Sequence, residues 1–437
     1  MPETGASAKP RLMVALDQMN LERALAMAKD AVEGGVDILE AGTPLIKSEG
    51  LEAVRQLRKA FPEMPVFADM KTADTGALEC EIAAKAGASM VGILGSASDE
   101  TIQEAVRAGR KYGAEVVVDM IGVPDMVQRA REVEAMGAGY ISLHVGIDEQ
   151  MRGQVDFQFV QEIAQAVSIP VMVAGGLTSE TAPEVAGYGA QVIVVGGAIT
   201  KAKDIQAATA RIQEALSTGE AIESEGMKKF DETRVRDALL TCSSANLSDA
   251  QHRGGVLQGL KPVQQGAKVA GPVLTVATKD GDWAKPVEAI DRCEPGTVLV
   301  IDAQGGEDAV WGELASHTCQ LNGVAAVVID GALRDVDSIR EIGFPAWSRH
   351  VVPNAGDPKG FGEVGIEITC GGQTIRTGDW VLADDNGVVV IPKEELVEVT
   401  NRGVEVKEQE DRLRSEIKEG SSLSKVLDLK KWEKVIG

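Results

Sequence analysis

Aromatic residues are scarce in this sequence: Phe, Trp and Tyr together make up 3% of its 437 residues. Apolar residues nevertheless reach 44%, so aliphatic side chains must fill the interior. Parallel α/β proteins have this composition, because their central strands are buried on both faces and consist of aliphatic runs. The length by itself suggests two or three domains.

The sequence also lacks cysteine pairs and long apolar runs. Its five cysteines are odd in number and include no C-x-x-C pair, so we interpret them as reduced thiols of a cytosolic protein. No apolar run approaches the roughly 18 residues of a membrane span. The N-terminal MPETG lacks the basic and then apolar pattern of a signal peptide. We therefore expect a cytoplasmic protein without a membrane partner.

Positive charge is scarce as well. Asp and Glu number 67 against 44 Lys and Arg, and the formal net charge is −23. The excess is spread over both halves of the chain, as in a solvated surface. Such a surface argues against nonspecific binding to nucleic acids or membranes.

The first half repeats one unit, an aliphatic strand followed by an amphipathic helix. Even spacing of eight such units within residues 1–216 is typical of a (β/α)8 TIM barrel. A doubly wound sheet is the alternative, but it rarely contains eight such even units. The strand-like runs are Leu12–Leu16, Asp37–Glu40, Val66–Asp69, Met90–Leu94, Val116–Asp119, Tyr140–His144, Val171–Ala174 and Val192–Val195.

The second half has a different order and spacing of predicted strands and helices. Residues 217–232 are polar and are interpreted as a linker. Residues 233–437 hold strand-like runs close together, and Asp385-Asn386-Gly387 is a strong hairpin signal. The chain ends in a charged helical stretch. We therefore predict a barrel followed by a separate mixed α/β domain with a C-terminal helix.

The predicted barrel strands end in charged residues that would share one mouth. Neighbouring carboxylates raise each other's pKa, and a hard cation removes that cost. Glu40 and Asp69 end neighbouring strands, which predicts Mg²⁺ or Mn²⁺ between them. Lys71 offsets part of the remaining charge, and His144 can act as a general base or acid. The strand-end residues are Asp17, Glu40, Asp69 with Lys71 and Asp74, Asp119 and His144.

Glycine pairs follow the last two predicted barrel strands, at Gly175-Gly176 and Gly196-Gly197. Loops at these positions of such barrels commonly bind phosphate through backbone N–H groups, and glycine permits the close approach. Tight turns without a ligand are the alternative. The occurrence of two pairs favours a phosphate site.

Seven segments of the first half occur in the order expected of one family. The sequence around Asp69, Lys71 and Asp74 is Asp-x-Lys-x-x-Asp, and the other segments surround Asp17, Glu40, Asp119, His144 and the two glycine pairs. Residues 10–216 thus resemble the orotidine monophosphate decarboxylase superfamily. The forms Glu-x-Gly-Thr-Pro-Leu-Ile and Leu-His-Val-Gly-Ile-Asp are similar to its 3-hexulose-6-phosphate synthase branch.

This resemblance implies an Mg²⁺-dependent aldol reaction that joins formaldehyde and ribulose 5-phosphate into 3-hexulose 6-phosphate, or the reverse. It implies that Glu40 and Asp69 hold the metal, that His144 moves the C1 proton and that Lys71 supports the oxyanion. Asp17 would belong to the catalytic group and Asp119 to the substrate-binding residues, with the glycine pairs on the phosphate.

Asp74 would reach into the partner's site, which implies a dimer. The related keto-gulonate-phosphate decarboxylases, the alternative within the superfamily, carry Arg shortly after the His. Ile147 and Asp148 stand in that neighbourhood here.

A second candidate site combines Gly312-Glu313-Leu314 with Arg334-Asp335. Arg suits a carboxylate and Asp a hard metal. Residues 228–400 resemble the family of ribonuclease-activity regulator A and 4-hydroxy-4-methyl-2-oxoglutarate aldolase, with a swivelling β/β/α fold. The resemblance implies a metal on Asp335, substrate contacts from Gly312, Glu313, Leu314 and Arg334, and a trimer.

The aldolases usually carry Asp where Glu313 stands, so three roles for the second domain remain open. It could be accessory, a second aldolase or decarboxylase, or a protein-binding regulator of RNA processing. A dimeric barrel and a trimeric second domain together would allow a hexamer. The fusion resembles an archaeal arrangement, in which the reverse barrel reaction would supply pentose phosphate.

Overall fold

The computed structural model describes residues 9–146, 150–153, 156–224, 226 and 229–427. The chain forms two compact units. The first contains Met1–Gln150 and Gln154–Lys228, and the second contains Met151–Gly153 and Lys229–Gly437. Among the described helices, none has the length and apolar character that a membrane crossing requires.

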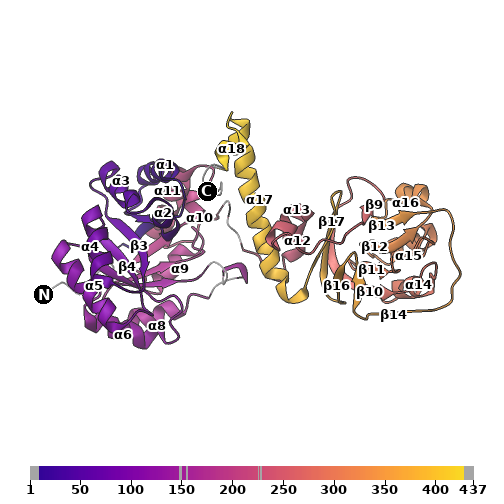
Figure 1. Cartoon of the computed structure of the whole chain (residues 1–437), viewed down its shortest axis with the longest axis horizontal. Helices are drawn as coiled ribbons and strands as arrows, with labels where there is room; N and C mark the ends of the chain where they lie inside the picture. The colour runs from indigo at the N-terminus through magenta and orange to yellow at the C-terminus, as the bar shows by residue number, and fades with distance from the viewer. Residues whose placement is uncertain (1–8, 147–149, 154–155, 225, 227–228, 428–437) are drawn as a thin grey trace, which may run out of the picture. The chain divides into compact units, whose positions relative to one another are not determined.

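The first unit is a closed barrel of eight parallel strands, which confirms the predicted fold (Figure 1). Strand β1 pairs with both β2 and β8, and this closes the ring. The strands are β1 (Arg11–Leu16), β2 (Ile38–Ala41), β3 (Val66–Thr72), β4 (Met90–Leu94), β5 (Glu115–Asp119), β6 (Tyr140–His144), β7 (Val171–Ala174) and β8 (Val192–Val195).

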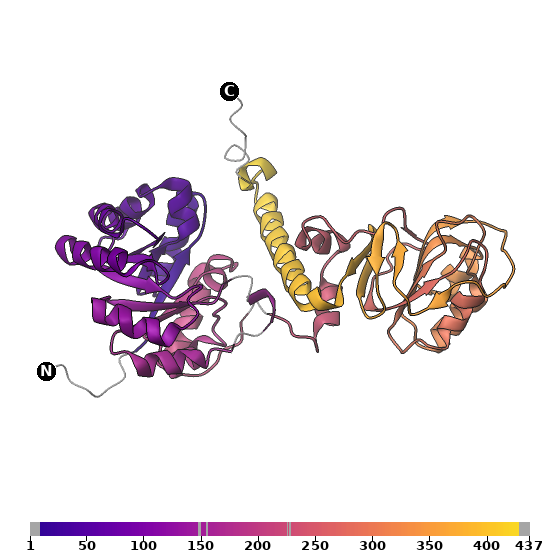
Figure 2. The ribbon, with the colours of Figure 1, turned by 60° about the horizontal axis from the view of Figure 1, so that its bottom comes forward.

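Helices surround the barrel strands in both ribbon views (Figures 1 and 2). They are α1 (Leu21–Glu33), α2 (Thr43–Glu49), α3 (Glu52–Ala60), α4 (Gly76–Ala86), α5 (Asp99–Tyr112), α6 (Met126–Met136), α8 (Phe159–Ala166), α9 (Ala182–Gly187), α10 (Gly197–Thr200) and α11 (Ile205–Thr218).

Strand alternation divides the buried side chains of the barrel into two layers. One layer, with Ile38 and Phe67 among its members, fills the inside of the barrel. The other, with Leu39 and Ala68, packs beneath the helices. Because side chains alternate along a strand, residues two positions beyond the inner layer also point inward. This places the charged strand-end residues in the barrel mouth.

The second unit is built on a sheet in the order β18-β17-β10-β11-β12-β13-β9, of which β10 to β13 are parallel neighbours. The predicted hairpin is present, because Asp384 pairs with Gly387. The strands are β9 (Lys261–Pro262), β10 (Val269–Ala277), β11 (Val298–Asp302), β12 (Ala326–Leu333), β13 (Ala346–Val351), β14 (Glu363–Val364), β15 (Ile368–Cys370), β16 (Gln373–Ile375), β17 (Trp380–Asp384) and β18 (Gly387–Ile391).

Helices of the second unit form two groups in Figure 1. The first group, at the parallel strands, is α14 (Ala284–Ile290), α15 (Glu313–Leu321) and α16 (Val336–Ile342). The second group gathers near β17 and shares a separate apolar cluster. It contains α12 (Val235–Thr241), α13 (Ser244–Ala250) and the long C-terminal α17 (Leu396–Lys418), which is followed by α18 (Leu423–Val426).

Helices α4 and α5 pack closely at Gly76, and this contact predicts how a substitution there changes stability. A Cβ atom on Gly76 would lie 2.1 Å from the Thr101 carbonyl oxygen, so Gly76→Ala must push the two helices apart. We expect a loss of about 1–3 kcal/mol in the free energy of unfolding. Gly187→Ala is the control, since nothing lies within 4 Å of its Cβ position. Calorimetric melting should show a lower Tm for Gly76→Ala alone; equal melting of the two variants would contradict this packing.

Candidate active site at the barrel mouth

Five strand ends place their acidic and basic side chains in one mouth. Glu40 and Asp69 are each 7% exposed and Asp119 is 4% exposed, which is unusual for ionisable residues. His144 ends β6 and is half-buried. Buried charges of this kind require partners or a bound ligand. The structure therefore brings these predicted residues together.

Lys71 lies in a local irregularity of β3. Its φ of +50° is left-handed, which is uncommon outside glycine, and the β3–β4 register shifts between Ala68 and Thr72. The irregularity lets Lys71 reach back toward Asp69, two residues earlier. Backbone strain of this kind costs roughly 1–3 kcal/mol and tends to occur at functional sites.

The Lys71 ammonium bridges two aspartates. Its Nζ lies 2.9 and 3.0 Å from the two Asp69 oxygens and 2.7 Å from Asp119 Oδ2. Burial works to lower the pKa of Lys71, but the charges of Asp69 and Asp119 outweigh it and raise that pKa. Lys71 is therefore a permanent cation in the mouth and not a proton acceptor.

Glu40 is a buried carboxylate of the mouth. Within the described part of the chain, no hydrogen bond or ion pair reaches its side chain. Burial, and then the charges of Asp69 and Asp17, raise its pKa well above the usual value. Asp17 keeps an exposed face, yet desolvation and Asp69 raise its pKa too. At neutral pH, the mouth favours either a proton or a cation at Glu40.

These residues fit the predicted Mg²⁺ or Mn²⁺, with Glu40 and Asp69 as its protein ligands. The described residues contain no ready cluster of three or more His, Cys, Asp or Glu ligands. Mg²⁺ does not require one, because it is usually held by one or two carboxylates together with water and substrate oxygens. The unpartnered, desolvated Glu40 beside Asp69 is the feature that supports the fit.

Asp119 connects Lys71 to the histidine. The same Oδ2 that accepts from Lys71 lies 3.8 Å from His144 Nδ1, and Oδ1 accepts a 2.9 Å hydrogen bond from the Ile121 backbone. Asp119 is thus held in place while facing both groups. This arrangement can orient the imidazole and stabilise its protonated form, as a proton-transferring histidine requires.

The glycine pairs end neighbouring strands beside this mouth. Gly175 and Gly176 have φ values of +104° and +69°, and a Cβ atom on Gly175 would lie 2.2 Å from the Val145 carbonyl. Gly196 and Gly197 lie at the start of α10 after β8. The hypothetical Cβ of Gly196 lies 3.8 Å from Asp17 Oδ2. The structure therefore places both pairs at the acidic mouth.

Asp74 is not part of this cluster. It is exposed, and its Oδ1 accepts a 2.7 Å hydrogen bond from the Thr75 backbone. Ile147 and Asp148, which bear on the decarboxylase alternative, lie outside the described residues.

Sequence reasoning did not assign three residues that shape the mouth. Thr43 Oγ1 lies 2.7 Å from Asp69 Oδ2, so it donates to the proposed metal ligand. Gly92 leaves room for Asp69, since its Cβ would lie 3.2 Å from Oδ1. Gly42 does the same for Asp17, at 2.1 Å. The Gly-Thr-Pro run directly after β2 was the available signal.

The residues of the second candidate site also lie close together. Asp335 has a left-handed φ of +58°, and its Oδ2 accepts from the Glu313 backbone N–H at 3.3 Å. Arg334 Nε lies 3.5 Å from the same oxygen. A Cβ on Gly312 would lie 2.5 Å from Asp335 Oδ2, so a glycine is needed there, and Leu314 is 75% exposed.

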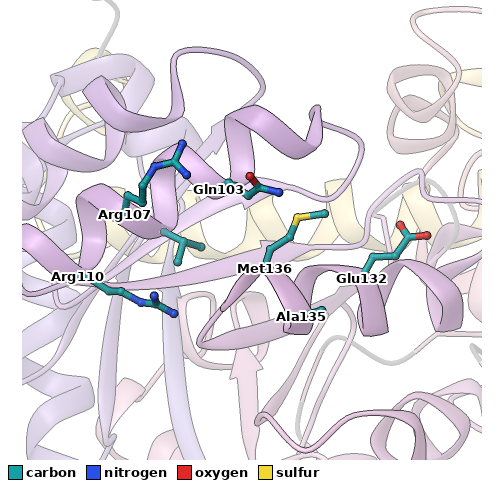
Figure 3. A pocket seen from close by; sticks show the side chains of 7 residues that line it. Gln103, Arg107, Arg110, Glu132, Ala135 and Met136 are labelled. Atoms are coloured by element: carbon teal, nitrogen blue, oxygen red, sulfur yellow. The ribbon is translucent and has the colours of Figure 1, made fainter.

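An open groove on the outer surface of the barrel is a separate feature. It lies between α5 and α6 and is lined by Arg107, Arg110, Glu132 and Met136 among others (Figure 3). None of the strand-end residues lines it, so it does not belong to the candidate active site.

The raised pKa of Glu40 predicts how stability depends on pH. Folded, metal-free protein keeps a proton on Glu40 above the ordinary value of 4.5, so stability falls as pH rises through the window between the unfolded and folded pKa. Glu40→Gln should therefore raise the Tm of EDTA-treated protein at pH 8 and leave it unchanged at pH 4. Asp74→Asn, at an exposed carboxylate, is the control. A Tm difference that does not depend on pH would refute this role of Glu40.

Known proteins match the two units separately. The family model described as Orotidine 5'-phosphate decarboxylase / HUMPS family matches residues 10–212, and the one described as Aldolase/RraA matches residues 244–390. The 3-hexulose-6-phosphate synthase of Mycobacterium gastri is 45% identical over 207 residues, which are 47% of this chain and 100% of that protein.

The 3-hexulose-6-phosphate synthase of Bacillus subtilis (strain 168) is 37% identical over 209 residues, covering 48% of this chain and 99% of that protein. A crystal structure of a 3-hexulose-6-phosphate synthase has 46% identity and a TM-score of 0.46, covering 47% of this chain and 99% of the other. The chain therefore belongs to the orotidine 5'-phosphate decarboxylase/HUMPS family, as a lyase whose barrel is followed by an Aldolase/RraA domain.

Proposed function

We propose that the barrel catalyses the reversible aldol condensation of formaldehyde with ribulose 5-phosphate to 3-hexulose 6-phosphate. The observation that carries this proposal is the mouth itself, where Lys71 bridges Asp69 and Asp119 beside the unpartnered Glu40 and next to His144. The 45% identity to a 3-hexulose-6-phosphate synthase, along its whole length, supports the same reaction.

The residues of the mouth divide the chemistry between them. Bound at Glu40 and Asp69, Mg²⁺ would polarise the ketone oxygen of the substrate. His144 would remove the C1 proton of ribulose 5-phosphate, and Asp119 would stabilise the resulting imidazolium. The C1 carbanion equivalent then forms the new carbon–carbon bond with formaldehyde, and the formaldehyde oxygen takes up the proton.

Lys71 and the glycine loops would serve binding and charge stabilisation. The permanent positive charge of Lys71 is suited to an oxyanion that develops during proton removal. Backbone N–H groups at Gly175-Gly176 and Gly196-Gly197 would hold the phosphate, and Asp17 Oδ2 lies 3.8 Å from the Cβ position of Gly196. The same groups serve the reverse reaction, which releases formaldehyde and pentose phosphate.

The exposed surface near Asp74 supports a dimer of barrels. Asp74 is exposed, and two apolar side chains of the following helix α4 are also exposed: Leu78 at 59% and Ile82 at 39%. A second copy that covers this surface would bury them and bring Asp74 to the neighbouring site.

Formaldehyde consumption tests the barrel reaction. Purified protein with Mg²⁺ should consume formaldehyde only when ribulose 5-phosphate is present, and EDTA should stop the reaction. Asp69→Asn should abolish turnover, and His144→Gln should lower kcat by roughly 10²- to 10⁴-fold. His317→Gln, in the second unit, is the matched control. Turnover that survives Asp69→Asn, or that needs no ribulose 5-phosphate, would exclude the assignment.

For the second unit we propose a second aldolase or decarboxylase site, whose substrate is a 2-oxo acid that releases pyruvate when it is cleaved. Arg334 and Asp335 directly precede α16, and Asp335 contacts the first residue of α15. Their placement beside each other favours a catalytic role over a purely accessory one. Exposed Leu314 (75%) and Leu321 (87%) on the same helix support a trimer that would enclose the site.

Pyruvate release distinguishes an enzyme from a binding module. The protein with Mg²⁺ should release pyruvate from 4-hydroxy-4-methyl-2-oxoglutarate or oxaloacetate. Asp335→Asn should abolish the release, whereas Asp337→Asn, at an exposed neighbour, should not. No release above the rate of Mg²⁺ alone would favour a protein-binding module, such as a regulator of RNA processing.

A further inference from the structure

Thr43 is the first residue of helix α2, but its hydroxyl group is bonded to a different element of the barrel. The N-cap residue of the helix is Gly42, and no side-chain cap is formed. Thr43 Oγ1 instead lies 2.8 Å from the Asp69 carbonyl oxygen and 2.7 Å from Asp69 Oδ2. A threonine that follows β2 is therefore bonded to the mouth end of the neighbouring strand β3.

The two carboxylate oxygens of Asp69 face different strands. Oδ1 lies on the side of β4, because it is 3.2 Å from the Cβ position of Gly92. Oδ2 lies on the side of β2, because Thr43 comes two residues after the last residue of that strand. Glu40 belongs to β2 as well. One Asp69 oxygen is thus turned toward the strand that carries Glu40, as a cation shared by the two carboxylates requires.

The Lys71 ammonium alone does not fix this orientation. It lies 2.9 and 3.0 Å from the two Asp69 oxygens, and it also contacts Asp119. Because a lysine side chain is flexible and its ammonium donors rotate, Lys71 can follow the carboxylate and does not select one of its oxygens. Among the described residues, Thr43 is the other hydrogen-bond donor to this carboxylate, and it contacts Oδ2.

Burial makes the loss of this donor costly. Asp69 is 7% exposed and Thr43 is half-buried, so water has little access to replace the hydroxyl group. Groups that hydrogen-bond a ligating carboxylate orient it and change the affinity of the site for its metal.

We propose that Thr43 is a positioning residue that holds the Asp69 carboxylate toward β2 and thereby sets the affinity of the barrel mouth for a divalent cation. This inference rests on the proposed cation site at Glu40 and Asp69. Thr43 acts through Asp69 and takes no part in proton transfer at His144.

Calorimetric titration of the full chain with Mn²⁺ alone tests this role. The binding that is lost in Asp69→Asn identifies the site in the mouth. Thr43→Val keeps the shape of the side chain but lacks the hydroxyl group, and it should weaken this binding by roughly 10- to 100-fold. Thr43→Ser retains the hydroxyl group and should restore the wild-type Kd. Thr43→Ala is a second variant without the donor, in case Thr43→Val does not fold.

Ser48→Ala is the matched control for a purely structural effect. Ser48 lies on the same helix, and its Oγ donates a 2.7 Å hydrogen bond to the Met19 carbonyl. Its removal also takes a bond between α2 and a distant main-chain group, but it leaves Asp69 untouched. Ser48→Ala should therefore keep the wild-type Kd for Mn²⁺. An equal loss of affinity in Ser48→Ala, or a failure of Thr43→Ser to restore it, would overturn the positioning role.

The same titrations separate this inference from the proposed reaction. A wild type that binds Mn²⁺ in the mouth but consumes no formaldehyde would contradict the reaction, while a weaker Kd in Thr43→Val would still support the inference. An unchanged Kd in folded Thr43→Val or Thr43→Ala overturns the inference and leaves the reaction standing. A wild type that binds no Mn²⁺ in the mouth overturns the inference as well.

Discussion

The candidate active site depends on the electrostatic balance around one lysine. Lys71 is the cation placed between Asp69 and Asp119, while Glu40 and Asp17 lie in the same mouth with raised pKa values. One ammonium does not neutralise four carboxylates, three of which are buried, so binding of a cation would relieve the remaining repulsion. A proton on Glu40 is the alternative when no cation is bound.

The barrel holds these charged side chains in one mouth because the strands fix the direction in which each side chain points. Closure through β1 and β8 fixes the inward face of each strand, and the alternation along β2 and β3 places Glu40 and Asp69 above an apolar inner layer. Small residues then make the space: a side chain at Gly42 or Gly92 would collide with Asp17 or Asp69. Thus the unfavourable charges are held by packing that is itself favourable.

Much of this arrangement could be predicted from the sequence. Eight evenly spaced aliphatic runs predict a parallel barrel, and the charged residues or glycine pairs that end seven of them predict the groups at its mouth. The hairpin at Asp385-Asn386-Gly387 could also be predicted, because Asp, Asn and Gly between two apolar runs favour a tight turn. The contact of Thr43 with Asp69 could not, since a Thr after a strand has no periodic signal that reveals which carboxylate it faces.

By itself, the sequence determined the order of the elements and the chemical groups available, because periodicity and strand-end residues are local properties. Only the tertiary structure decided which groups meet. It showed that Glu40 has no hydrogen-bond or ion-pair partner among the described residues, and that Asp119 faces both Lys71 and His144. It also showed that Asn401 donates a hydrogen bond to the carbonyl of Met151, 250 residues earlier in the chain. Such contacts depend on register, bulges and loop packing, which arise when distant segments fold together and leave no pattern along the chain.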